Sequence, residues 1–171
     1  TNNKFSSNNF IPVVSHSNAS GNAINGSIDF YKLTSFGNGY AVFANGAVVS
    51  NGSSSNTTTF TISSDSFTLS SNDDFYNTCG MYFTAGAANG QYAVISDWDA
   101  SANQITLATP LASTPNTSSR FEITPNVNVV GNGTGAKARV RINTSTNTAA
   151  NVQVIQRGSG YTHAEVTIAG N

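Results

Sequence analysis

The sequence predicts an all-β protein. Of its 171 residues, 38% are hydrophobic and only 9% are charged, and the apolar segments are dominated by Thr, Val, Ile, Phe and Tyr, which favour strands. Short alternating segments are separated by clusters of Gly and Asn, which form tight turns because both residues tolerate positive φ. No stretch of ten residues carries an apolar stripe at helical spacing.

Strict alternation of apolar and polar residues predicts strands at 59–62, 136–142, 151–155 and 165–168. In the second of these segments Lys137, Arg139 and Arg141 fall on one face of the strand and the apolar residues on the other. We expect this basic row to be solvated or to face another subunit, because it lacks the interleaved aromatic residues of a nucleic-acid surface.

Two segments share one pattern, an alternating strand that ends in G-x-G-Y. They read S-I-D-F-Y-K-L-T-S-F-G-N-G-Y-A at 27–41 and A-N-V-Q-V-I-Q-R-G-S-G-Y-T at 150–162. We expect the glycines to form a turn and the following tyrosine to pack over the core. These residues are Gly37, Gly39 and Tyr40 in the first copy and Gly158, Gly160 and Tyr161 in the second. A related turn, G-N-G-T-G-A, occupies 131–136.

Between the repeats the composition changes, first to a Ser-, Asn- and Thr-rich stretch at 50–59 and then to a series of aromatic and acidic motifs. The sequence therefore predicts a split outer β domain, sandwich-like and built from the two G-x-G-Y repeats, that comprises residues 1–46 and 127–171. A small β module, residues 47–126, is predicted to be inserted into it.

Composition excludes several classes of function. Asn, Ser and Thr make up 66 of the 171 residues, and seven basic groups nearly balance eight acidic ones. A near-neutral surface favours association with other proteins, whereas a nucleic-acid partner would require a basic excess and a membrane span an apolar run of about 18 residues. One cysteine, Cys79, cannot form an internal disulfide. Because the chain starts at Thr1 rather than Met, we interpret it as an excised piece or a processed product.

Catalysis is not predicted. The histidines are His16 and His163, and the nominal triad of His163 with Ser159 and Glu165 would come from one strand and its turn, not from separate converging elements. No enzyme activity, cofactor or metal is expected.

The sequence around the paired acidic residues favours a role in turns over a role in catalysis or metal binding. Asp73 and Asp74 precede Phe75 and are interpreted as turn residues. We expect the chain to be extended at this pair, so that the two adjacent carboxylates point to opposite faces. A second run, D-W-D-A-S-A-N at 97–103, partly copies the oxygen spacing of a calcium loop but lacks its glycine and its final glutamate. We expect a hairpin turn at 100–103, with Asp and Asn capping their own backbone.

The aromatic residues of the inserted module allow two interpretations. Alternation places Trp98 inward, on the opposite face from Asp97 and Asp99, where it would pack in the core against Tyr82 or Tyr92. The alternative is a glycan platform, which requires Trp98, Tyr92 and Tyr82 to be exposed together in one cleft.

Two sets of motifs resemble phage proteins. Residues 73–123 contain, in order, D-D-F-Y-N, G-M, G-A-A-N-G-Q, I-S-D-W-D, I-T-L and P-N-T-S-S-R-F-E-I, which resembles a small β module recurrent in tail, fibre and other virion proteins of tailed phages. The ends carry N-K-F at 3–5, F-I-P-V at 10–13, the G-x-G-Y strands and the turn at 131–136. They resemble the baseplate wedge subunit of T4-like myoviruses, especially the cyanophage type.

The resemblance implies a non-catalytic virion structural protein of a contractile-tail baseplate, assembled in the host cytoplasm. Its implied partners are other baseplate proteins and a second copy of the chain in a dimer, with no nucleic acid and no membrane. The alternative function is a receptor- or glycan-binding module of a tail fibre or surface adhesin.

Overall fold

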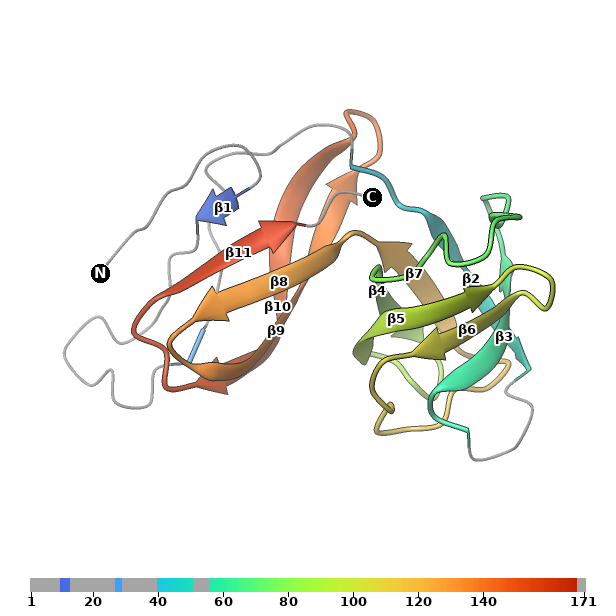
Figure 1. The fold of residues 1–171 in the computed structure, drawn as a ribbon, viewed down its shortest axis with the longest axis horizontal. Coiled ribbons are helices and arrows are strands. Elements are labelled where there is room, and N and C mark those ends of the chain that lie inside the picture. Colours follow the sequence, from blue (N-terminus) through green and yellow to red (C-terminus); the bar gives the residue numbers. More distant parts are fainter. Residues whose placement is uncertain (1–9, 13–26, 29–39, 51–55, 169–171) are drawn as a thin grey trace. The chain divides into compact units, whose positions relative to one another are not determined.

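A computed structural model describes residues 10–12, 27–28, 40–50 and 56–168. Within these ranges every regular element is a strand (Figure 1), which confirms the all-β class. The chain divides into two compact units. Val42–Thr124 forms one, here called the barrel unit, and Thr1–Ala41 with Pro125–Asn171 forms the other, here called the sheet unit.

The barrel unit is a closed barrel of six antiparallel strands in the order β2-β3-β6-β5-β4-β7. Closure leaves no strand edge open, because β2 pairs with both β3 and β7. The strands are β2 (Ala44–Ser50), β3 (Thr59–Ser64), β4 (Gly80–Ala85), β5 (Tyr92–Asp99), β6 (Gln104–Leu107) and β7 (Arg120–Thr124). The turn expected at 100–103 joins β5 to β6.

Alternation along these strands fills the barrel with apolar side chains. Burial in β3 and β6 alternates residue by residue, as expected where one face of a strand meets a core. Phe60 and Phe83 meet edge to face, with their ring centroids 5.9 Å apart. The largest fully buried side chains of this unit are Trp98, Tyr76, Phe60, Phe83, Phe121, Met81, Ile95, Ile105 and Ile123.

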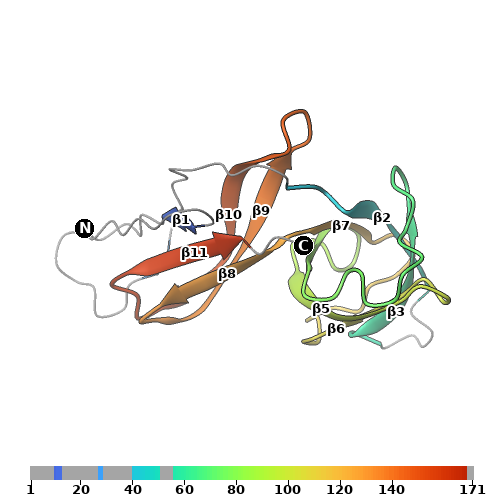
Figure 2. The same ribbon diagram turned by 45° about the horizontal axis from the view of Figure 1, so that its top comes forward.

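The sheet unit is a five-stranded antiparallel sheet in the order β1-β11-β8-β9-β10. β8 pairs with β9 only at Asn126 and Val127, whereas β9 pairs with β10 along nearly its whole length. The β9–β10 hairpin therefore curls away from β8 and β11 (Figure 2), and the sheet encloses a core of its own. The strands are β1 (Phe10–Pro12), β8 (Asn126–Gly131), β9 (Thr134–Asn143), β10 (Thr148–Ser159) and β11 (Ala164–Ile168).

The division between the units differs from the predicted boundaries. The boundary predicted between residues 46 and 47 falls inside β2, since Ala44 already pairs with Ile123 of β7. The second boundary, predicted between 126 and 127, falls at the start of β8. The prediction followed the change in composition, but strand pairing decides which unit a residue joins.

The basic row on β9 is only partly solvated. Lys137 and Arg141 are exposed, but Arg139 is 4% exposed, and its Nε donates a hydrogen bond to Oε1 of Gln153 at 2.9 Å. Arg139 pairs with Asn126 of β8 on one side and with Gln153 of β10 on the other. The expectation of a solvated row is thus wrong for Arg139, whose guanidinium is held against the side chain of Gln153 on the neighbouring strand.

Only the ends of the first G-x-G-Y segment are described. The amide of Ile28 donates to the carbonyl of Arg157, and that of Tyr40 donates to the carbonyl of Asn147, each at 3.0 Å. Both side chains belong to the core of the sheet unit, and Tyr40 is 7% exposed. Gly37 and Gly39 lie outside the described residues.

Candidate functional site

The second G-x-G-Y turn is built around the ring of Tyr161, which is 5% exposed. A Cβ atom added to Gly133 would lie 2.5 Å from this ring, one added to Gly158 2.8 Å, and one added to Gly131 3.1 Å. Gly158 also adopts a φ of 66°, which disfavours other residues. Gly131 at the end of β8, Gly133 in the turn that follows it and Gly158 near the end of β10 therefore form the surface on which the tyrosine packs.

Asn132 joins the β8–β9 turn to the β10–β11 turn by hydrogen bonds. Its Oδ1 accepts from the backbone N–H groups of Thr162 (3.0 Å) and His163 (3.3 Å), and its Nδ2 donates to Oγ1 of Thr162 (2.7 Å). The sequence indicated only a turn residue here. The contact could not be predicted because its partners lie 30 and 31 positions away.

Gly133 allows a direct test of this packing. We expect Gly133→Ala to lower the free energy of unfolding by about 1–3 kcal/mol, the usual cost of overpacking, because its Cβ would also approach the Ser159 carbonyl oxygen at 2.5 Å. Gly90→Ala is a comparison variant that adds backbone strain without overpacking, because its φ is 83° and an added Cβ meets nothing within 4 Å. Urea titration measures both effects, and a Gly133→Ala variant as stable as the parent would contradict the packing argument.

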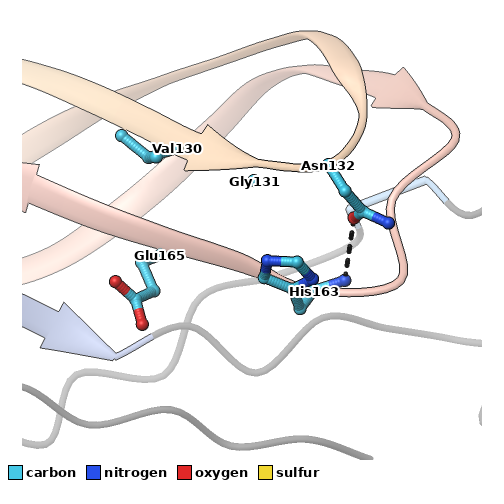
Figure 3. Close-up of a pocket in the computed structure, with 5 residues that line it drawn as sticks. All are labelled: Val130, Gly131, Asn132, His163 and Glu165. Atoms are coloured by element: carbon cyan, nitrogen blue, oxygen red, sulfur yellow. Dashed lines mark hydrogen bonds between the residues drawn. The ribbon is translucent and has the colours of Figure 1, made fainter.

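A shallow pocket of about 220 Å³ lies beside this turn and is lined by Val130, Gly131, Asn132, His163 and Glu165 (Figure 3). The side chains of His163 and Glu165 lie on the same side of the strand. Ser159, the third member of the nominal triad, does not line the pocket. The pocket therefore provides no nucleophile next to the histidine, and it does not assemble the geometry of acyl transfer.

The acidic residues cap turns. Oδ1 of Asp99 accepts from the Ser101 hydroxyl at 2.7 Å and from the Ala102 amide at 3.1 Å, and these two bonds lower the pKa of Asp99. Oδ1 of Asp73 accepts from the Ala100 amide at 2.9 Å. Across the part of the chain that the structure describes, no three metal-binding side chains of the His, Cys, Asp or Glu type lie together.

Asp73 and Asp74 do not lie on an extended chain, so the expectation of opposite faces is wrong. Residues 73–78 form a turn in which Asp74 has a φ of 64°. Oδ1 of Asp74 accepts a hydrogen bond from Nδ2 of Asn77 at 2.7 Å. The acidic pair thus contributes to turn formation, as Asp side chains commonly do.

The glycan platform of three aromatic residues is not present. Trp98 is 1% exposed, and its indole N–H donates to the Ser70 carbonyl at 3.2 Å. Its ring packs edge to face on Tyr76, with the centroids 5.0 Å apart, not on Tyr82 or Tyr92 as predicted. Tyr92 is also buried. Of the three rings, only Tyr82 is partly exposed on the barrel.

The barrel unit carries a second hollow of about 300 Å³, which the sequence did not indicate. It is lined by Asn45, Gly46, Asp65, Thr84, Arg120, Phe121 and Glu122. Both oxygens of Asp65 contact Nη1 of Arg120, at 3.0 and 3.1 Å, and both side chains of this pair are about half exposed. Exposed ion pairs contribute little to stability.

Cys79 is buried in the barrel and has no disulfide. Burial raises the pKa of its thiol from 9.0 to about 11. Because the thiolate is the reactive form, we expect no reaction with Ellman's reagent at pH 8 until urea unfolds the barrel. Rapid modification of the folded protein would contradict this.

The raised pKa also predicts a pH dependence of stability. Below about pH 9 the thiol is protonated in both states. Between about 9 and 11 the unfolded chain loses this proton and the folded chain retains it, so the free energy of unfolding falls as the pH rises. Urea titrations should show a smaller fall in Cys79→Ala.

The described residues include no helix with the length and apolar character needed to span a membrane. Comparisons with protein-family models, with curated proteins and with solved structures found no match.

Proposed function

We propose that this chain is a non-catalytic structural protein of a phage virion, part of a contractile-tail baseplate wedge, that acts through contacts with other virion proteins. The observation that supports the proposal is that polar side chains form hydrogen bonds within and between turns. Asn132, Asp99 and Asn116 hold turns and join neighbouring loops. Such contacts give rigid, shape-defined surfaces, which is what a protein interface requires.

The charge and the motifs support the same proposal. A formal net charge of −1 on 171 residues leaves little long-range repulsion between neighbouring subunits. The wedge-like G-S-G-Y turn is built from a buried tyrosine and glycines at positive φ, so this motif has a structural role in this chain. The proposal includes self-association as a dimer, location in the virion, and assembly in the host cytoplasm.

Cross-linking of purified virions tests this function. Lys137 is exposed on β9, so an amine-reactive cross-linker should join it to peptides of other virion proteins. Peptides of this chain should be present in virions in a fixed ratio to known tail proteins. If these peptides occur in the infected-cell lysate and are absent from purified virions, the proposal is wrong.

A further inference from the structure

We propose that the polar hollow on the barrel unit binds a neutral saccharide. This inference is independent of the virion proposal and concerns the residues that line the hollow: Asn45, Gly46, Asp65, Thr84, Arg120, Phe121 and Glu122. Its volume of about 300 Å³ lies at the lower end of small-molecule sites. A single sugar ring or the end of a glycan suits this size.

The hollow lies on the outer face of the barrel, where three strands meet. Asn45 of β2 pairs with Glu122 of β7, and Glu122 pairs in turn with Tyr82 of β4. Phe121 and Ile123, the neighbours of Glu122 along β7, are buried in the core, so alternation directs Glu122 outward. The carboxylate, the amide and the partly exposed phenol ring therefore form one row across the face.

A β-bulge places a hydroxyl beside this row. Phe83 pairs with Phe121 and Ala85 pairs with Arg120, which leaves Thr84 as the extra residue of β4. Bulges redirect a side chain relative to the regular pleat, and here the exposed Thr84 lines the hollow next to Arg120.

The charges favour a neutral ligand. Asp65 contacts Nη1 of Arg120 through both of its oxygens and offsets its positive charge, and Glu122 adds a second carboxylate. An anion would meet a net negative lining. A ligand with many hydroxyl groups can donate to the two carboxylates and accept from the guanidinium and the amide at the same time.

One lining atom lacks a partner. Oδ1 of Asn45 is buried and accepts no hydrogen bond from the described residues, an arrangement that costs free energy in the unbound protein. Asn45 lines the hollow, and a rotation of its side chain would bring this oxygen to a ligand hydroxyl. Tyr82, the strand partner of Glu122, is partly exposed at the end of the row and does not itself line the hollow.

Nuclear magnetic resonance of the complete chain tests the inference. Amide signals of 45, 84 and 120–122 would be followed during titration with D-galactose, D-mannose, L-rhamnose and N-acetyl-D-glucosamine. We expect at least one sugar to shift these signals with a dissociation constant on the order of 1 mM, typical of a ligand of about twelve non-hydrogen atoms. N-acetylneuraminic acid, which is anionic, should bind more weakly.

Two variants and a control locate the site. Glu122→Gln removes a charged acceptor and should weaken binding about tenfold or more, and Thr84→Val, at an exposed position, should weaken it about fivefold. The control, Glu165→Gln, makes the same Glu-to-Gln substitution at the pocket of the sheet unit. It should leave the dissociation constant within about twofold of the parent's. Urea titration verifies that each variant is folded.

Three outcomes would overturn the inference. The first is the absence of any signal shift at a sugar concentration roughly ten times the expected dissociation constant. The second is binding that both Glu122→Gln and Thr84→Val retain unchanged, and the third is shifts confined to 130–132 and 163–165. Each of these results is compatible with a virion role, so failure of this inference is distinguishable from failure of the proposed function.

Discussion

Replacing Tyr161 by Ala is expected to lower the free energy of unfolding by about 3–5 kcal/mol, the range for large aromatic truncations in a core. The ring is buried and packs on Gly131, Gly133 and Gly158. Its removal leaves a cavity that the neighbouring glycines have no side chains to fill. Hydrogen exchange at the amides of β9, which belongs to the same unit, measures the loss directly.

Tyr161→Phe is the matched control, because it keeps the ring and removes only the hydroxyl. We expect it to cost much less than the alanine variant. If both variants retain the stability of the parent, the ring is not packed as described and becomes a candidate for a binding contact.

Replacing Trp98 by Ala is expected to destabilise the barrel unit by about 3–5 kcal/mol. The indole is 1% exposed, packs against Tyr76 and donates to the Ser70 carbonyl. The variant therefore loses core packing and leaves a carbonyl without its hydrogen bond. Urea titration followed by circular dichroism should show the change as an earlier transition.

The fluorescence of the parent protein provides an independent check, because Trp98 is the only tryptophan in the sequence. We expect blue-shifted emission, weak quenching by acrylamide, and no change when saccharides are added, since the indole does not line the polar hollow. Red-shifted emission that is readily quenched would show an exposed ring and would contradict the buried position.

Local pattern was sufficient to predict four of the strands, β3, β9, β10 and β11. The alternating segments at 59–62, 136–142, 151–155 and 165–168 all lie within strands, because alternation reflects which face of a strand is buried. The inward position of Trp98 followed from the same rule. The turn at 100–103 could be predicted in the same way, because the capping contacts of Asp99 involve residues only two or three positions apart.

Partners distant in sequence could not be predicted in this way. The closure of the barrel depends on the pairing of β2 with β7, and the burial of Arg139 depends on which strands flank β9. The sequence also indicated the wrong partner for Trp98, because Tyr76 comes from a turn whose position alternation does not define.

The sequence by itself determined the all-β class and the strand segments of β3, β9, β10 and β11, because each depends on residues only a few positions apart. The tertiary structure alone decided that Tyr161 packs on Gly131, Gly133 and Gly158, that Asn132 joins the β8–β9 turn to the β10–β11 turn, and that Asp65 reaches Arg120 across 55 positions. Strand register brings such residues together, and a shift of one residue would reverse the face on which each side chain lies. Register is a property of the whole sheet, so these contacts and the hollow that they border appear only in the folded chain.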